Sequence, residues 1–454
     1  MDYRGTGRST LLDCVAAQAL TTGSPSSRDV DPTEIAAYAK ALEIEYNDLA
    51  VFSITSTATD LATLISKYTN GASTIVYGAS YGSTLATRLM HMNPPEVAGY
   101  VLDGIASVPG APAGKFEYLS TYETDFGEVG DHFLNLCALD SACSTHFSKK
   151  SLSDTLEDLL VQFDKDPSST CAALVSNKTS SWSSVKASNA TASFKLRKTL
   201  GNLLPGPGER TLIPPIVYRL SRCSAEDVEV MTNFFNVRYG GGSPAQSDEY
   251  SSDLLANLIM FSEMWEVPGP SLDEMNARFA GTKLSDGSIY ILAPVYCAFT
   301  KDKSEWCKQL GFGDYEANAI LYERDEYWNK SATIPSQASV LLLSSRMDAK
   351  TPHKYARTLL DILDGDNKEL ISFDDTNHVA LLWSFLVDND YSSETCGMRL
   401  LASYVSSGGN LQKLDRSCVD EMPPFNLTTP SELKYKYLGT EDAYDGAFDA
   451  SLRQ

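Results

Sequence analysis

The sequence of 454 residues contains no run of about 18 uncharged apolar residues, the length that a helix needs to cross a bilayer. Basic side chains are also scarce, since 37 Lys and Arg face 59 Asp and Glu and give a formal net charge of −22. A chain this acidic repels nucleic acid and anionic lipid headgroups, so we expect neither as a partner. Hydrophobic residues make up 43% of the chain, which excludes a disordered, collagen-like or coiled-coil protein.

The first ten residues, MDYRGTGRST, lack the basic and apolar segments of a signal peptide. Other features nevertheless indicate an oxidising, secretory environment. Nine cysteines include three pairs that are close in sequence, and none has the spacing of a zinc site. The close pairs are Cys137 with Cys143, Cys297 with Cys307, and Cys396 with Cys418, and Asn-x-Ser/Thr sequons begin at Asn177, Asn189, Asn329 and Asn426. We therefore expect a secreted, vacuolar or lysosomal glycoprotein with disulfide bonds if the chain is full length.

The first 110 residues are predicted to alternate helices with buried strands. Helical segments carry capping residues and end in stop signals such as Asn-Gly or Pro-Pro, whereas the strands are short apolar runs. The predicted helices cover residues 31–44, 57–71 and 80–94, and the predicted strands cover residues 73–80 and 99–105. Strand, helix and strand in this order predict a parallel sheet with covering helices.

The strand pattern then stops and returns only near the end of the chain. Residues 111–330 are predicted to be mainly helical, with a polar, Ser/Thr-rich stretch inside them. Further strands are predicted at 338–348 and 368–378, and further helices at 351–366 and 396–409. We therefore predict an α/β domain built from residues 1–110 and 331–454, split by a large helical cap at 111–330.

The sharpest motif is Gly78-Ala79-Ser80-Tyr81-Gly82, which has the G-x-S-x-G pattern of a nucleophile elbow. A nucleophilic serine must project from a turn between strand and helix that is too tight for bulky neighbours, and here Gly78 and Gly82 flank Ser80. The motif also lies between a predicted strand and a predicted helix. We predict that Ser80 is a catalytic nucleophile, and the alternative is a glycine-rich turn with a bystander serine.

A serine nucleophile needs a base, and in hydrolases with this elbow the order along the chain is serine, acid, histidine. His378 follows the last predicted strand, where a loop could deliver its imidazole to the carboxyl edge of the sheet. We assign the base to His378, and the alternative is an ordinary surface histidine. The other histidines lie on the elbow helix, in the insertion or at the start of a helix: His91, His132, His146 and His353.

The acid that orients the base is assigned to Asp348, which directly follows the apolar strand run SVLLLSS. Asp103 is the rival because it also ends a predicted strand, but we expect it to be a structural carboxylate that hydrogen-bonds the turn at Gly104. Asp374 and Asp375 are too close to His378 in an extended chain to turn back toward it.

With these residues in place, the sequence resembles the tripeptidyl-aminopeptidase-like and prolyl-aminopeptidase-like serine exopeptidases of the α/β-hydrolase fold. The resemblance covers residues 1–110 and 330–430 and is weak in the insertion. The matching features are DYRGTGRST at Asp2–Thr10, GASYGSTLA, VLDGI, Asp348 with Thr351-Pro352, His378, and Cys396 with Gly408-Gly409 and Cys418. It implies a mostly parallel sheet with flanking helices, split by a helical cap.

Members of this group have three strands before the Asp-x-Arg-Gly segment, and a Gly-rich loop that supplies one donor of the oxyanion hole. The resemblance assigns the other donor to the backbone N–H of Tyr81. This sequence begins at the Asp-x-Arg-Gly segment, so we expect the first strands and that loop to be missing from a truncated chain, together with a partner for Cys14. Arg4, Gly5 and Gly7 are expected to form a tight structural loop beside the elbow.

The resemblance implies a serine aminopeptidase that releases short peptides or proline from free peptide N-termini, with no cofactor or metal. Such an enzyme needs a carboxylate to bind the substrate ammonium, and in relatives acids of the cap do this. The segment Leu258–Pro270 offers Glu263 and Glu266, for which an exposed acidic helix face is the alternative. The alternative functions are an esterase or lipase with the same triad, and an inactive truncated chain.

Overall fold

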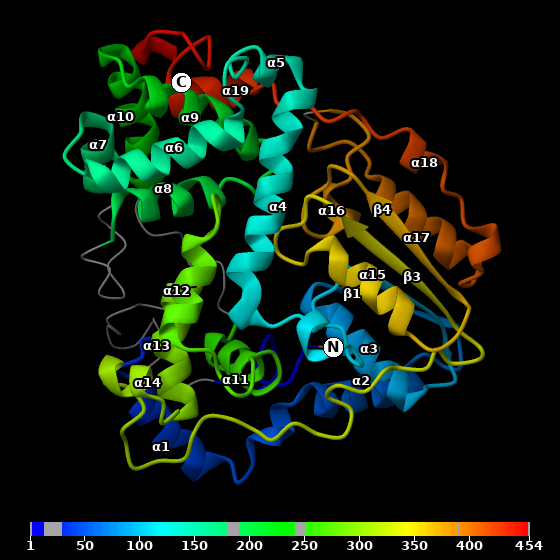
Figure 1. Cartoon of the computed structure of the whole chain (residues 1–454). Helices are drawn as coiled ribbons and strands as arrows, with labels where there is room; N and C mark the ends of the chain where they lie inside the picture. The colour runs from blue at the N-terminus through cyan, green and yellow to red at the C-terminus, as the bar shows by residue number, and fades with distance from the viewer. Residues whose placement is uncertain (1, 13–29, 179–189, 241–250, 389, 453–454) are drawn as a thin grey trace.

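A computed structural model describes residues 2–12, 30–178, 190–240, 251–388 and 390–452 (Figure 1). Its centre is a parallel sheet whose four strands lie in the order β1-β2-β3-β4. The strands are β1 Thr74–Ala79, β2 Val97–Asp103, β3 Ser339–Ser345 and β4 Lys368–Phe373. The prediction of an α/β protein with a parallel sheet is confirmed, and all four predicted strands are present.

Strands β2 and β3 are neighbours although residues 104–338 separate them in the sequence. The register pairs Gly99 with Ser339 and Asp103 with Leu343. Every residue of β3 is buried, which explains its nearly continuous apolar sequence, because a central parallel strand is covered on both faces. The sheet therefore closes only when two distant parts of the chain meet.

Helices cover both faces of the sheet. Alternate side chains of the central strands point to opposite faces, so Tyr100 and Leu342 pack on one side and Val101 and Leu341 on the other. The first face is covered by α2, α3 and α15, and the second by α16 and α17. These helices span α2 Ile54–Tyr68, α3 Tyr81–Met92, α15 His353–Ile362, α16 Ala380–Trp383 and α17 Cys396–Ser406.

The helix ends follow the signals in the sequence. Helix α2 begins at the cap Ser53, whose side chain accepts from the backbone N–H of Ser56, and ends just before Asn70 and Gly71 in left-handed conformations. Helix α3 ends at Met92, immediately before Asn93 and the two prolines. The helix predicted at 31–44 is α1 Ile35–Glu45.

The segment between β2 and β3 is mainly helical, as predicted. We call its helices the inserted helices: α4 Tyr122–Leu136, α5 Ser141–Ser144, α6 Leu152–Lys165, α7 Thr170–Lys178, α8 Ala192–Gly201, α9 Ile213–Arg222, α10 Ala225–Tyr239, α11 Asp253–Glu263, α12 Leu272–Ala280, α13 Ile289–Thr300 and α14 Glu305–Leu310, with the short η6 Glu209–Leu212. In Figure 1 these helices form a body to one side of the sheet, and they are not the helices that cover its two faces.

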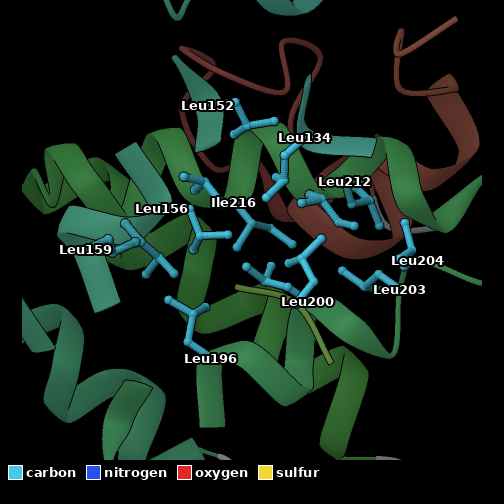
Figure 2. Packing of buried hydrophobic residues seen from close by; sticks show 14 of the residues in the cluster. Leu134, Leu152, Leu156, Leu159, Leu196, Leu200, Leu203, Leu204, Leu212 and Ile216 are labelled. Atoms are coloured by element: carbon cyan, nitrogen blue, oxygen red, sulfur yellow. The ribbon is translucent and has the colours of Figure 1, made fainter. Parts of the chain in front are cut away.

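The inserted helices have hydrophobic cores of their own. Figure 2 shows one in which Leu134 of α4, Leu156 of α6, Leu200 of α8 and Ile216 of α9 point toward one another. A second core joins α11 and α13 to α1, from the beginning of the chain. Each core contains many fully buried hydrophobic side chains, and their burial stabilises this part of the protein.

The end of the chain does not stay with the sheet. The sequence grouped residues 331–454 as one part, but the short helix α19 Ser431–Leu433 lies beside α9 (Figure 1), η8 Lys434–Leu438 packs against α10, and η9 Ala450–Leu452 follows them. Leu427, Tyr437 and Tyr444 belong to the core of the inserted helices. The short α18 Ser417–Asp420 is the last helix that packs against α17 near the sheet.

Four disulfides are present in the described residues, consistent with a secreted or lumenal protein. The three pairs that are close in sequence are bonded, and Cys171 and Cys223 form a fourth bond across 52 residues. Cys14 and the sequon at Asn189 lie outside the described residues. Within the described ranges, every helix is too short or too polar to pass through a membrane.

Candidate active site

Ser80 occupies a sharp turn between β1 and α3. Its φ of 53° and ψ of −124° lie outside the regions that non-glycine residues normally adopt, so the serine is held in a strained conformation. The turn is fixed by the Ser80 backbone N–H, which donates to the Asp103 carbonyl at 2.8 Å. The predicted arrangement of strand, tight turn and helix is present.

The two glycines of the motif have different roles. A Cβ atom at position 78 would lie 2.2 Å from the backbone oxygen of Gly82, so only glycine fits where β1 meets α3. A Cβ atom at position 82 would meet nothing within 4 Å. The expectation that close packing requires glycine on both sides of Ser80 is therefore correct for Gly78 and wrong for Gly82.

Asp348 and His378 form a direct contact at the carboxyl ends of β3 and β4. The imidazole Nδ1 lies 2.9 Å from Oδ2 and 3.1 Å from Oδ1 of the carboxylate. Asp348 is 1% exposed, and its Oδ1 accepts from the backbone N–H groups of Lys350 and Thr351 at 2.9 Å. The Thr351 hydroxyl donates to Oδ2 at 2.6 Å. This buried carboxylate is therefore rigid, and it fixes the orientation of the imidazole.

The serine and the imidazole flank the same short stretch of β2. Ser80 bonds to the backbone of Asp103, and the next residue, Gly104, packs against His378. Gly104 has a φ of 68°, and a Cβ atom there would lie 2.9 Å from Thr351 Oγ1 and 3.2 Å from the imidazole Cε1, so both backbone conformation and space favour glycine. Ser80 and His378 are both partly exposed. Their side chains are not joined by a hydrogen bond in the described structure, which is common before substrate binds.

Asp103 is structural, but its partners differ from the predicted ones. The carboxylate accepts from the backbone N–H groups of Ala380 and Leu381, each at 2.8 Å, and from the Tyr77 hydroxyl at 3.0 Å. Burial raises the pKa of Asp103 to about 6. The predicted bond to the turn at Gly104 is wrong, because the Gly104 N–H donates to the Leu343 carbonyl. Asp103 instead holds the chain that follows His378.

The remaining candidates have other contacts. Nε2 of His91 lies 3.3 Å from the Lys330 carbonyl, and His146 stacks on the ring of Tyr444. His353 begins α15 and His132 lies within α4. Asp374 is exposed and pairs with Arg346 at 3.1 Å. Of the five histidines, His378 alone contacts a buried carboxylate in the described structure.

The predicted loop at the beginning of the chain lies beside the elbow. Arg4 forms a bidentate pair with Asp60 of α2, and Gly5 and Gly7 adopt left-handed conformations with φ of 81° and 61°. The Tyr3 hydroxyl is hydrogen-bonded to the Tyr81 hydroxyl. Tyr81 is the first residue of α3, so the helix itself leaves its backbone N–H without an acceptor.

The two acids considered for the substrate ammonium both have cationic partners within the chain. Glu263 is 4% exposed and accepts from Arg88 at 2.9 Å and from Tyr322 at 2.8 Å. Glu266 is less buried and pairs with Arg278 at 2.6 Å. Glu266 also lines a cavity of about 480 Å³ between the loop after β2, α4, α12 and α15, whereas Glu263 does not. The alternative of an exposed acidic helix face is therefore wrong for Glu263.

Sequence patterns did not indicate two arginines that matter here, Arg88 on the elbow helix and Arg210 in η6. A single arginine carries no local signal of the acid or loop that it contacts far away in the chain.

Among the described residues, no group of three or more His, Cys, Asp or Glu side chains is arranged to hold a metal ion. No protein-family model matches the chain, and no curated protein matches it.

Proposed function

We propose that the chain is a serine hydrolase of the α/β-hydrolase fold, with Ser80 as nucleophile, His378 as base and Asp348 as acid. One observation carries the proposal: the buried Asp348 carboxylate contacts the imidazole of His378 at 2.9 Å, and that imidazole packs on Gly104, directly beyond the residue that fixes Ser80. A strained serine, a partly exposed imidazole and a fixed carboxylate at one sheet edge suit nucleophilic acyl transfer.

In the proposed reaction, Ser80 Oγ attacks the carbonyl carbon of the substrate while His378 Nε2 takes the hydroxyl proton. The bond from carbon to the leaving nitrogen then breaks, and His378 returns the proton to the leaving amine. Water attacks the carbonyl carbon of the resulting serine ester and gives a proton to His378, the bond from that carbon to Ser80 Oγ breaks, and His378 returns the proton to Oγ as the acid product leaves. Asp348 stabilises the imidazolium in both halves, and the backbone N–H of Tyr81 donates to the oxyanion.

The most specific activity that we propose is that of an aminopeptidase acting on peptides with a free N-terminus. Support comes from the resemblance of residues 1–110 and 330–430 to the tripeptidyl and prolyl aminopeptidase group. Of the two candidate acids, Glu266 is the more accessible to a substrate ammonium, because it lines a cavity while Glu263 is enclosed. The residues that line this cavity do not include Ser80 or His378. Four disulfides support work in an oxidising compartment.

An esterase or lipase with the same triad is the second candidate. It is favoured by the internal pairing of both acids, since Glu263 and Glu266 have Arg88 and Arg278 as partners and need no substrate ammonium. Such an enzyme would hydrolyse acyl esters and would not distinguish free from blocked peptide N-termini.

Covalent labelling tests the nucleophile directly. The disulfide-bonded chain would be treated with a fluorophosphonate, and we expect about one adduct per chain on Ser80, none in Ser80→Ala, and slow labelling in His378→Ala. His353→Ala is the matched control because His353 lies near the same sheet edge without an acid partner, and it should label normally. Folded wild type without an adduct, or equal labelling of Ser80→Ala, would overturn the proposal.

Substrate panels then separate the two candidates. Ala-Ala-Phe- and Pro-linked chromogenic amides would be compared with their N-acetylated forms and with short acyl esters. An aminopeptidase cleaves the free amides and rejects the acetylated ones. An esterase cleaves the esters and shows no preference between the two kinds of amide.

A further inference from the structure

The loop that carries His378 is held from outside the sheet by a buried arginine of the insertion. Arg210, in η6, is 7% exposed. It donates to the side-chain oxygen of Asn377 at 2.7 Å and to the carbonyl of Asp375 at 2.8 Å. Asn377 is itself buried and donates back to the carbonyl of Pro205. The three residues before His378 are thus connected to residues 205–210.

The guanidinium in this position is costly for the fold. Its hydrogen bonds go to an amide oxygen and a backbone carbonyl rather than to a carboxylate, and its Nε has no hydrogen-bond partner. Burial lowers the pKa of Arg210 to about 10. Asp375 and Asp388 interact with this cation electrostatically and the Phe425 ring lies 5.6 Å from its guanidinium carbon, but its hydrogen bonds are spent on the residues just before His378.

The backbone beside His378 is strained and needs such support. Val379 has a φ of 67°, a left-handed conformation that a β-branched residue rarely adopts. Asp103 holds the following residues through the N–H groups of Ala380 and Leu381, and Arg210 holds the preceding ones. A strained residue persists only when the surrounding structure fixes it on both sides. Removing either anchor therefore lets the loop relax and turns the imidazole away.

We propose that Arg210 is a positioning residue for the base: it fixes residues 375–377 so that the imidazole of His378 stays in contact with Asp348 and can reach Ser80 during the reaction. The inserted helices thereby take part in catalysis without touching the reacting atoms. This role rests on the proposed function, because it concerns the rate at which His378 activates Ser80. A misplacement of about 1 Å in a catalytic group lowers rates on the order of 10²-fold.

The test compares two arginines of the same insertion. Arg219, in α9, is fully buried and bonds to Asp227 and to the Ala443 carbonyl, far from the His378 loop in sequence and in contacts. Arg210→Gln should slow fluorophosphonate labelling of Ser80 by about 10- to 100-fold. It should also lower kcat while leaving KM within about twofold. Arg219→Gln should lower the melting temperature yet label normally when folded.

Asn377→Ala provides a second route if Arg210→Gln folds poorly. It removes one of the two acceptors, so we expect a smaller loss, and the double variant should lose less than the product of the two single effects, because both act through one contact. Wild-type labelling by folded Arg210→Gln would overturn the proposal. Equal slowing in Arg219→Gln would also overturn it, because general loosening would then explain the effect.

Hydrogen exchange separates failure of this proposal from failure of the proposed function. Peptides covering residues 374–382 should exchange faster in Arg210→Gln than in wild type or Arg219→Gln. If wild type is not labelled at Ser80, the proposed function fails and the catalytic role of Arg210 fails with it, whatever the exchange result. If wild type is labelled and the exchange of this loop is unchanged in Arg210→Gln, only the positioning role is wrong.

Discussion

Arg88 and Glu263 form a salt bridge of 2.9 Å between side chains that are 3% and 5% exposed. The pair joins the elbow helix α3 to α11 of the insertion. Glu263 also accepts from Tyr322, so both its oxygens are engaged. Breaking a buried pair costs more than the pair itself contributes, because the remaining charge loses its nearest partner, and Arg88 would keep a longer contact of 3.4 Å with Asp325.

Glu263→Gln should therefore lower the free energy of unfolding by about 3–5 kcal/mol, measured by urea denaturation. Glu266→Gln is the matched control: its pair with Arg278 is about a quarter exposed and should contribute about 1 kcal/mol or less. If Glu263→Gln stays as stable as wild type but loses activity only on peptides with free N-termini, then Glu263 binds the substrate and does not stabilise the fold.

Asp348→Asn should lower kcat on the order of 10⁴-fold with little change in KM, because the amide favours the wrong imidazole tautomer. Thermal unfolding should shift little if the backbone N–H groups of Lys350 and Thr351 keep the remaining oxygen in place. Asp374→Asn is the control, since Asp374 is exposed and pairs only with Arg346 at the surface. The measurement is steady-state kinetics on the best substrate. If Asp348→Asn and Asp374→Asn have comparable kcat values, Asp348 is not the acid of the triad.

Thr351→Val removes the hydroxyl that bonds to Asp348 at 2.6 Å and lies 3.2 Å from Nδ1 of His378. A hydrogen bond of this kind contributes about 1 kcal/mol, so we expect a loss of about fivefold in kcat/KM. Thr351→Ser keeps the hydroxyl and should restore most of the rate. Failure of serine to restore it would show that the methyl group, not the hydroxyl, matters.

The pH dependence of stability reports on Asp103. Its pKa is about 6 in the folded chain, mainly through burial, whereas an unfolded Asp titrates at about 3.9. Between these values the folded state holds a proton that the unfolded state has released, so stability falls as the pH rises. Relative to Asp103→Asn, the wild type should lose about 3 kcal/mol between pH 4 and pH 7. A stability difference that rises with pH would contradict this assignment.

Removal of the disulfides should follow loop length. The bond between Cys171 and Cys223 closes 52 residues, and that between Cys137 and Cys143 closes 6. Chain-entropy arguments give losses of about 4 and about 2 kcal/mol for the paired alanine variants. Urea unfolding of the two double variants would measure the difference, and an equal loss would mean that loop length does not govern their contribution.

Local patterns predicted the sheet and the central contact of the site. Apolar runs marked the four strands, and the elbow motif placed Ser80 at a turn. Asp348 and His378 were predicted from their places near the ends of two strands, from the order serine, acid, histidine and from the family resemblance. They lie three residues beyond β3 and five residues beyond β4, at the edge to which parallel strands bring their carboxyl ends.

Long-range partners were not predictable in this way. Nothing near Arg88 or Arg210 in the sequence indicates Glu263 or the loop before His378, which lie 175 and about 167 residues away. Asp103 was predicted to bond to the turn at Gly104, whereas its partners, Ala380 and Leu381, are far away in the sequence and could not be predicted from local patterns. The last residues were grouped with the sheet because their packing on α9 and α10 leaves no periodic signal.

The disulfides lie within the parts of the molecule, whereas noncovalent contacts hold the parts together. Three of the four join cysteines within residues 137–307, the fourth joins residues 396 and 418, and none of these four ties the inserted helices to the sheet. That boundary is held by noncovalent contacts, both the polar bonds of Arg88 and Arg210 and the apolar packing of Tyr81 and Leu85 of α3 against the core that contains α11. A thiol reductant should therefore lower the stability of each part without cutting a covalent link between them, because none of these four disulfides crosses the boundary.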